Sequence, residues 1–566
     1  MRGDFRLQRF TMRLDITDHL AEALKEALTR AGLPIPESVF WEVPREERHG
    51  DYATNVAMAL ARPARQPPRK LAEAIVSHFP ETAAVDRIEI AGPGFLNVFL
   101  RPRWCAEALR GILGAGAAYG TSAAGSGKRY LLEFVSANPT GPLVIVNARA
   151  AAVGDALARI LRSLGETVET QYYVNDAGNQ FQALARSFEV RVHQALGEAV
   201  DLPEGSYPGE YLVDLARDYL ARDAPAAKAV LALPEAERLE RLGRYAVDLI
   251  VAGQRRVLDE YGTVFDRFIH EAADVRAAGL PARAIEALTR AGFTHEQDGA
   301  LWFRSPELGD DKDRVLRKSD GELTYFAVDI GFHHFVKFAD VDAVIDFLGP
   351  DHHGYVARIR AAMEALGHPR EAFDVIIVQL VTLLRDGQPV RMSKRRGEFV
   401  LMEELLEEVG RDAARFTFLT RRHDSPLEFD LAVATRQSAD NPVYYVQYCH
   451  ARVSSLFRNA ATLGLDLPPW SEADFTPLAL AEEQTLIKRL LQYPDMVAGA
   501  ARAREPHRVA YYLAELAGVF HPYYKAYRVI TDDRALTLAR LGLCAAVGQV
   551  VRNGLGLLGV SAPEGM

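Results

Sequence analysis

Length and composition indicate a multidomain protein. The 566 residues are 49% hydrophobic and 25% charged, which predicts roughly three or four domains. The N-terminus has no apolar core followed by a small-residue cleavage site, and no run of about eighteen apolar residues occurs. We therefore expect neither export nor membrane spanning, and the expected location is the cytoplasm.

Net charge and cysteine usage exclude some classes of function. The formal net charge of -10 argues against indiscriminate nucleic-acid binding, although a large acidic protein can still gather Lys and Arg on one face. Cys105, Cys449 and Cys544 lie far apart without a C-x-x-C spacing. A four-thiolate zinc site and a disulfide framework are therefore not expected, and the thiols should be buried and reduced.

The first hundred residues predict a small α/β domain. Residues 16–31 have apolar residues at helical spacing, and residues 87–100 alternate like strands around a turn at Gly92-Pro93-Gly94.

The middle of the chain predicts a doubly wound parallel sheet. An apolar run at 128–135 is typical of a buried strand, and after a loop with two prolines a helix with one apolar face ends at Gly165. A strand at 167–174 follows, and further strands are expected at 343–348 and 374–380. Ligands of such a sheet lie at the carboxyl ends of its strands. Residues 182–282, approximately, are mostly charged helix and are interpreted as an insertion, and residues 441–566 are predicted to be helical throughout.

Two distant segments carry a resemblance to a known family. E-F-V-S-A-N-P-T-G-P-L (133–143) and R-M-S-K-R (391–395) resemble the two signature segments of class I aminoacyl-tRNA synthetases. Three further segments, at 49–62, 91–100 and 441–452, resemble arginyl-tRNA synthetases of the bacterial type. The resemblance implies an N-terminal tRNA-binding domain over 1–115, a Rossmann-like catalytic domain over 116–435 and an all-α anticodon-binding domain over 436–566.

One signature departs from the family. Where the family carries a His-Ile-Gly-His type sequence, this chain has Val144-Ile145-Val146-Asn147. Val144 cannot hydrogen-bond a phosphate or the ribose, whereas Asn147 keeps an amide that can substitute in part. The departure puts the strength of catalysis in doubt more than the fold.

The resemblance implies an arginine site. Glu133, at the end of the first strand, and Asn138, in the loop after it, match family positions that hold the amino acid. Tyr325 and Asp329 are four residues apart, share a face if the segment is helical, and match residues that contact the arginine side chain. Asp351 is a further expected contact. Any one of these residues could have a purely structural role. Together they occur in the family's order with matching neighbouring sequences, which favours a role in binding arginine.

The resemblance also implies a nucleotide site. A turn at Gly141-Pro142-Leu143 leads to a helix that is expected to begin near Asn147, and free N–H groups at a helix N-terminus attract phosphate. Expected ATP contacts also include Gly349 and His352, although the paired histidines 352 and 353 leave zinc as a weaker alternative. Met392, Ser393 and Lys394 resemble the mobile catalytic loop, with Lys394 stabilising charge on the phosphates.

Two classes of function remain open. The first is an arginine–tRNA ligase that uses ATP and Mg²⁺, binds L-arginine and tRNA(Arg), and needs no metal site of its own; we expect a monomer. The second is a catalytically weak or repurposed paralogue that binds arginine or tRNA. Retention of residues that serve arginine and phosphate favours the ligase.

Overall fold

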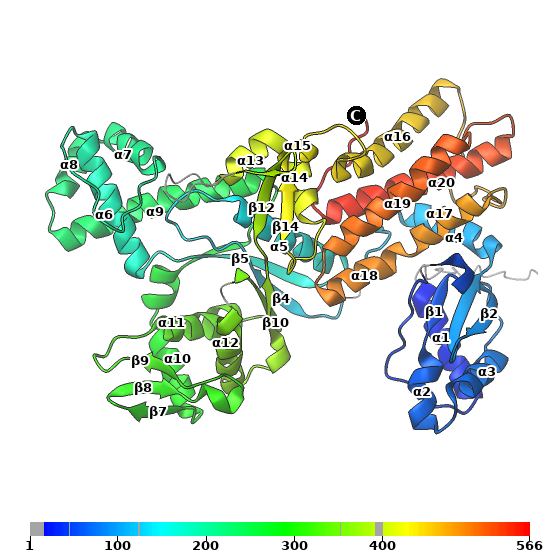
Figure 1. Cartoon of the computed structure of the whole chain (residues 1–566), viewed down its shortest axis with the longest axis horizontal. Coiled ribbons are helices and arrows are strands. Elements are labelled where there is room, and N and C mark those ends of the chain that lie inside the picture. The colour runs from blue at the N-terminus through cyan, green and yellow to red at the C-terminus, as the bar shows by residue number, and fades with distance from the viewer. Residues whose placement is uncertain (1–15, 45, 123–124, 351–352, 391–399) are drawn as a thin grey trace, which may run out of the picture.

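The structure is a computed structural model that describes residues 16–44, 46–122, 125–350, 353–390 and 400–566. Figure 1 shows a central parallel sheet with a helical arm on one side, a small α/β unit below the arm, and a helical bundle on the other side. The N-terminal domain, in blue, lies below the bundle.

The N-terminal domain is an antiparallel sheet of order β1-β3-β2 packed against three helices. Its elements are α1 (Ile16–Arg30), β1 (Tyr52–Thr54), α2 (Val56–Ala64), α3 (Pro68–His78), β2 (Val85–Ala91) and β3 (Phe95–Leu100). Leu20, Leu24 and Leu28 bury one stripe of α1, as helical spacing requires. The predicted helix and strand pair are confirmed.

The central sheet has five parallel strands in the order β11-β10-β4-β5-β6. The strands are β4 (Arg129–Glu133), β5 (Thr167–Val174), β6 (Arg267–His270), β10 (Ala343–Leu348) and β11 (Phe373–Ile377). Strand order reverses between β4 and β10, the position at which doubly wound sheets bind ligands. The helix α5 (Ile145–Ser163) connects β4 to β5 and ends before Gly165, whose φ of 85° suits glycine. The predicted fold class is confirmed.

Three boundaries differ from the prediction. The range 182–282 contains all but the first turn of helix α6 (Gly178–Ala195), and the whole of α7 (Tyr211–Arg222), α8 (Ala224–Leu231) and α9 (Glu235–Glu260). It also contains β6, which pairs with β5 and belongs to the central sheet. The four residues of β6, a short distance after a long charged helix, are too few to show a strand pattern. β4 stops before Val135, whose φ is positive, and β11 ends at Ile377 rather than Leu380.

The remaining elements up to residue 434 surround the central sheet. An antiparallel sheet β7-β8-β9 and a sheet β13-β12-β14 flank it. The elements in chain order are η3 (Glu271–Arg276), α10 (Leu280–Arg290), β7 (Thr294–Gln297), β8 (Ala300–Phe303), β9 (Arg314–Arg317), α11 (Tyr325–Phe332), η5 (His333–Lys337), α12 (His353–Ala365), β12 (Val381–Arg385), β13 (Gln388–Pro389), α13 (Met402–Val409), α14 (Arg411–Phe418), β14 (Leu427–Asp430) and α15 (Leu431–Ala434). η3 and η5 are π-helical. Short 3-10 turns are η1 (Glu47–His49), η2 (Gly116–Ala118), η4 (Ser305–Leu308) and η7 (Arg370–Ala372).

The C-terminal region is helical, as predicted. It contains α16 (Pro442–Thr462), α17 (Ala481–Leu491), α18 (Tyr493–Ala503), α19 (His507–Ala526) and α20 (Arg534–Leu557), and α4 (Pro102–Ala115) packs against α17 and α20. Among the described helices, only α20 is long and apolar enough to cross a membrane, and 67% of its apolar window is buried inside the protein. The three cysteines are buried and free.

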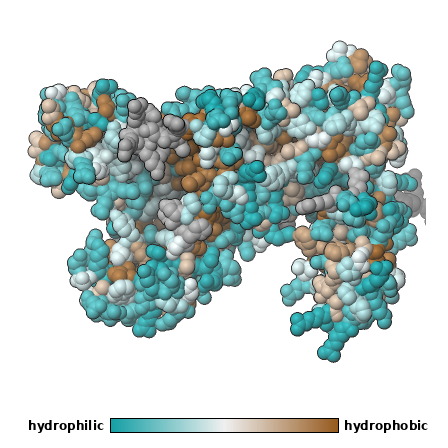
Figure 2. Space-filling view, viewed as in Figure 1, coloured by the Kyte–Doolittle hydropathy of each residue, from teal (hydrophilic) through white to brown (hydrophobic). Residues whose placement is uncertain are grey.

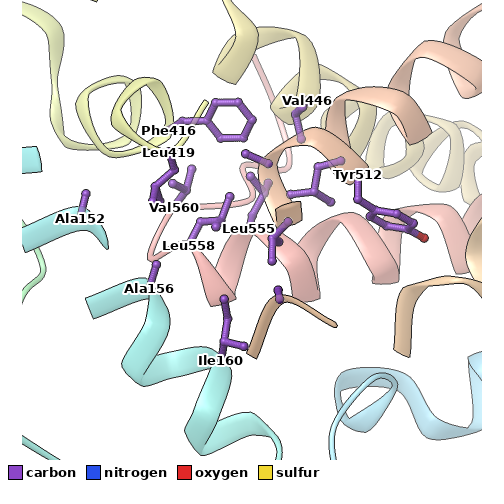
Figure 3. Packing of buried hydrophobic residues seen from close by; sticks show 14 of the residues in the cluster. Ala152, Ala156, Ile160, Phe416, Leu419, Val446, Tyr512, Leu555, Leu558 and Val560 are labelled. Carbon is purple, nitrogen blue, oxygen red and sulfur yellow. The ribbon is translucent and has the colours of Figure 1, made fainter. Parts of the chain in front are cut away.

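A shared core joins the bundle to the central sheet. Figure 3 shows Ala152, Ala156 and Ile160 of α5 facing side chains of the bundle, including Leu555 and Leu558. Arg415 of α14 is fully buried at this junction and forms an ion pair with Asp155 of α5. The same guanidinium donates to the carbonyls of Leu558 (3.0 Å) and Tyr261 (3.2 Å). Packing and a buried charge pair therefore hold the bundle against α5.

Candidate active site

A cavity of about 400 Å³ lies at the carboxyl edge of the central sheet, where the strand order reverses. Its lining residues are Glu133, Tyr173, Tyr325, Phe326, Asp329, Phe332, His333, Lys337, Asp346, Leu348, Tyr355 and Arg358. Three residues predicted for arginine, Glu133, Tyr325 and Asp329, therefore meet in one cavity although 196 positions separate the first from the last.

The helix α11 places two of these side chains. Thr324 caps it by accepting a hydrogen bond from the N–H of Ala327, so Tyr325 and Asp329 lie one turn apart. Tyr325 is 55% exposed at the rim of the cavity. A Cβ on Gly178 would lie 2.6 Å from the Tyr325 hydroxyl, and the φ of Gly178 is +72°. The positive φ therefore favours glycine at this position, and a Cβ there would displace the Tyr325 hydroxyl.

Lys337 occupies the floor of the cavity and was not predicted from the sequence. It is 2% exposed, and its ammonium lies 2.8 Å from Glu133 Oε2 and 2.6 Å from Asp346 Oδ2. Its third contact is Nε2 of His333 at 3.1 Å. Burial lowers the pKa of Lys337, but the charges of Asp346 and Glu133 outweigh it and the net pKa is raised. The ammonium is therefore retained inside the protein.

Asp329 is the carboxylate of the cavity that lacks a partner cation among the described residues. Burial, followed by the charge of Glu271, raises its pKa to about 7, while a hydrogen bond from Tyr355 and the charge of Lys337 act in the opposite direction. Glu271 itself accepts from the Tyr173 hydroxyl at 2.9 Å. Because the charged form of Asp329 is poorly compensated, the cavity favours a cationic ligand.

Hydrogen bonds from Ser136 and Gln254 hold Glu133 and the loop after β4 in place. Ser136 donates to Glu133 Oε1 at 2.9 Å, which holds the carboxylate on a second side. Gln254 of α9 donates to the carbonyls of Gly141 (2.8 Å) and Asn138 (3.3 Å) and accepts from the Tyr172 hydroxyl (2.8 Å). Gln254 was not predicted, because a single amide in a charged helix carries no sequence signal. Asn138, which was expected to contact the amino acid, is exposed and is not among the residues that line the cavity.

The start of α5 differs from the expected phosphate site. The helix begins at Ile145 rather than near Asn147. The Asn147 amide oxygen accepts the N–H of Val144 at 2.9 Å, and the N–H of Ile145 donates to the carbonyl of Val400 at 3.3 Å. Leu143 is buried, and its carbonyl accepts from the N–H of Met402 at 2.9 Å. Fewer N–H groups are thus free for phosphate than predicted, because residues 400–402 pair with 143–145.

The surface at this place is partly apolar. Figure 2 shows hydrophobic residues gathered in the middle of the molecule. Val146, in the first turn of α5, is 38% exposed, and Leu380, after β11, is 60% exposed. Pro142 is also exposed, and Gly349 directly follows β10. Asp351, His352, Met392, Ser393 and Lys394 lie outside the described residues.

Arg149 of α5 has a structural role. It is fully buried and donates to four backbone carbonyls, those of Gln379, Leu380, Arg422 and Ser425, at 2.8 to 3.3 Å. Burial lowers its pKa to about 10. It ties α5 to the segments that follow β11 and α14.

A second cavity, of about 700 Å³, lies between α16 and α19. Its lining residues include Tyr444, Tyr445, Tyr448, Arg452, His521, Tyr524 and Lys525. The Arg452 guanidinium carbon is 4.6 Å from the ring centre of Tyr448 and 5.0 Å from that of Tyr524. Exposed aromatic rings next to cations are typical of surfaces that stack nucleobases.

The comparisons with known proteins agree with this geometry. The chain matches the arginyl-tRNA synthetase N-terminal domain over residues 15–100, the class I (R) tRNA synthetase catalytic domain over 108–430 and the DALR anticodon-binding domain over 446–566. It is 48% identical over 555 residues to an arginine–tRNA ligase of Symbiobacterium thermophilum, covering 98% of both chains. A second such ligase, from Syntrophotalea carbinolica, is 46% identical over 98% of this chain and all of its own length.

A solved structure gives the same result for the fold. The arginyl-tRNA synthetase of Thermus thermophilus superposes with a TM-score of 0.76 at 25% identity, covering 97% of this chain and 100% of that one. The match of the catalytic domain alone spans more than half of the chain. The chain belongs to the arginyl-tRNA synthetase family.

Proposed function

We propose that this chain is an arginine–tRNA ligase. The carboxylate of arginine attacks the α-phosphate of ATP to form arginyl adenylate and release pyrophosphate, and the terminal ribose hydroxyl of tRNA(Arg) then attacks the adenylate to release AMP. The observation that carries the proposal is the cavity at the strand reversal, in which Glu133 and the uncompensated Asp329 face a volume suited to one amino acid.

Roles of the cavity residues follow from their positions. Asp329 and Tyr325 are assigned to the guanidinium, since a buried carboxylate with a raised pKa gains most from a permanent cation. Glu133 is assigned to the α-ammonium, with Asn138 and Asp351 as further contacts. The assignment of Asn138 requires a change of its exposed side chain when arginine binds.

The nucleotide is assigned to the adjoining surface. Gly141, Pro142, Leu143 and Gly349 would contact ATP together with His352 and Met392, and Lys394 with Ser393 and Asn147 would act on the phosphates. Mg²⁺ would enter with the nucleotide, since no cluster of three potential ligand side chains occurs in the described part of the chain and Mg²⁺ in such sites is held largely by phosphate and water. Its charge would stabilise the departing pyrophosphate.

The tRNA is assigned to the helical bundle and the N-terminal domain. The cavity between α16 and α19 offers rings and cations suited to unpaired bases. Tyr448→Ala should raise the KM for tRNA in charging about tenfold or more, since base stacking contributes roughly 1 to 3 kcal/mol. Tyr511→Ala, an exposed tyrosine of α19 outside this cavity, is the matched control. Equal KM values in the two variants would contradict the assignment.

The test of the whole proposal is arginine-dependent exchange of pyrophosphate into ATP, with and without tRNA(Arg). We expect exchange that depends on arginine and on tRNA. Binding of arginine and tRNA without any exchange or charging would refute the ligase and leave a binding paralogue. We further propose a cytoplasmic monomer, which size-exclusion chromatography with light scattering tests.

A further inference from the structure

The ammonium of Lys337 is enclosed by protein atoms in the cavity floor. It donates to Glu133 Oε2 at 2.8 Å and to Asp346 Oδ2 at 2.6 Å, and its third polar neighbour is His333 Nε2 at 3.1 Å. His333 is itself held in place, with Nδ1 2.8 Å from the carbonyl of Asp329 and Nε2 3.0 Å from Asp346 Oδ2. An ammonium has three donors, and its three close polar neighbours all belong to the protein.

The two carboxylates on Lys337 face each other across the sheet. Asp346 of β10 stands directly opposite Glu133 of β4 in the parallel register. Side chains of neighbouring strands at such positions are about 5 Å apart, and both carboxylates are withdrawn from water, with side-chain exposures of 4% and 12%. Without a cation between them, the pair would hold a proton rather than two charges.

We propose that Lys337 is a positioning residue that determines the orientation in which arginine binds in the cavity. It fixes Glu133 as an ionised acceptor, and its ammonium already fills the space between Glu133 and Asp346, so a guanidinium cannot pair there. Asp329 is then the carboxylate left for the guanidinium. This inference rests on the proposed function and deepens it.

The backbone supports this role. Lys337 ends the π-helix η5, one turn after His333, and η5 continues α11 without a break. The same short segment therefore presents Asp329 to the ligand and Lys337 to the floor. π-helical turns inside helices occur frequently at functional sites. The charged and titratable groups near Lys337 come from five elements: Glu133 of β4, Asp346 of β10, His333 of η5, Asp329 of α11 and Tyr355 of α12, with Tyr173 and Glu271 farther along the wall.

The experiment compares the purified full chain with Lys337→Met, and with Lys228→Met as a control at an exposed position of α8. Arginine binding is measured by calorimetry from pH 5.5 to 9, and KM is measured for arginine and for ATP. We expect Lys337→Met to weaken arginine binding about 30-fold or more, because a buried charge loses its partner. The KM for ATP should change by less than about threefold, since no ATP residue is touched.

The pH dependence of arginine binding distinguishes a positioning role of Lys337 from a merely structural one. In Lys337→Met, the facing carboxylates share a proton, so the pH below which arginine binding weakens should move upward. Lys337→Met combined with Asp346→Asn removes the repulsion and leaves Glu133 ionised, so it should recover part of the lost affinity, to an arginine Kd about three- to tenfold above that of the unmodified protein. A merely structural lysine would lower stability without shifting this profile.

Defined outcomes overturn the inference. A folded Lys337→Met variant with arginine affinity within threefold of the unmodified protein and the same pH profile would refute it. If that variant does not fold, the double variant decides, and unchanged arginine affinity there would refute it equally. Failure of the unmodified protein to bind arginine would instead overturn the proposed function.

Discussion

Asp329→Asn is expected to weaken arginine binding while making the empty protein more stable. The rise of the Asp329 pKa from 3.8 to about 7 corresponds to about 4 kcal/mol of unfavourable free energy for the ionised carboxylate. A bound guanidinium supplies the missing charge, and its loss should cost about 2 to 5 kcal/mol of binding. The arginine Kd should therefore rise about 30-fold to several thousand-fold.

The sign of the pH dependence follows from the same pKa. In the empty protein Asp329 is protonated below about pH 7, and a guanidinium favours the ionised form, so arginine binding releases a proton. The Kd of the unmodified protein should rise as the pH falls below 7, by up to tenfold per pH unit. The Asn variant should lose this dependence.

Asp329→Asn should weaken arginine binding but stabilise the fold. Because the pKa of Asp329 in the folded protein exceeds the unfolded value of 3.8, its ionisation destabilises the unmodified protein. This destabilisation is absent below pH 3.8, grows between pH 3.8 and 7, and is complete above pH 7. At pH 8, Asp329→Asn should therefore unfold at higher urea concentration, gaining up to about 4 kcal/mol. Asp218→Asn on the exposed side of α7 is the control. An arginine Kd within threefold of the unmodified protein, or a Kd that does not vary between pH 5.5 and 8, would refute this reasoning.

Three further changes test the scaffold. Arg415→Met should lower the free energy of unfolding by about 1 to 3 kcal/mol in urea titrations, since it leaves Asp155 with Arg159 alone and leaves the carbonyls of Leu558 and Tyr261 without their donor. An unchanged midpoint would show that packing alone holds the junction. Gln254→Ala should lower kcat/KM for arginine about 5- to 30-fold, because two hydrogen bonds to the loop after β4 are lost. Gln254→Glu should show the same loss, because a carboxylate has no N–H donors; full activity in Gln254→Glu would contradict this role of Gln254. Gly178→Ala should raise the KM for arginine by displacing Tyr325, and it should lower the free energy of unfolding by about 1 to 2 kcal/mol because φ is positive. The control Gly197→Ala also has a positive φ but open space around it, so it should lower stability without changing the KM.

Sequence patterns predicted the longer strands of the sheet well. β10 has the predicted bounds because it is an apolar run with one Asp, as buried parallel strands are. β5 has the predicted bounds because its eight residues are rich in β-branched and aromatic side chains. β6 was missed, since its four residues follow the 26-residue helix α9 and gain their strand character from pairing with β5. Pairing across the sheet is a tertiary effect that no local pattern records.

The site shows the same division. Glu133, Tyr325 and Asp329 were predicted from motif resemblance, and the structure brings them to one cavity. Lys337 and Gln254 were not, because each is a single polar residue, and the groups of the site that they hold, Glu133 and the carbonyls of the loop after β4, lie far away in the chain. Their importance comes from buried charge and buried carbonyls, which become visible only after folding.

The altered signature allows a final prediction. Asn147 caps its own helix by accepting the N–H of Val144, so Asn147→Ala should cost about 1 kcal/mol of stability and about fivefold in exchange rate. Lys394→Ala should be far more severe, since a cation on the phosphates acts mainly in the transition state. Weak but measurable exchange in the unmodified protein is expected, because bringing two bound substrates together supplies much of the acceleration without the histidines.

If the chain is instead a binding paralogue, the unmodified protein should show no exchange, and restoring the family residues at 144–147 should create it. Restoring the family residues by Val144→His, Val146→Gly and Asn147→His would also remove an exposed apolar side chain from the first turn of α5. If this triple variant exchanged pyrophosphate while the unmodified chain bound arginine and tRNA without any exchange at high enzyme concentration, the ligase proposal would fail. If the unmodified chain is active, the triple variant should gain no more than the one or two hydrogen bonds that histidines can add, about ten- to a few hundred-fold.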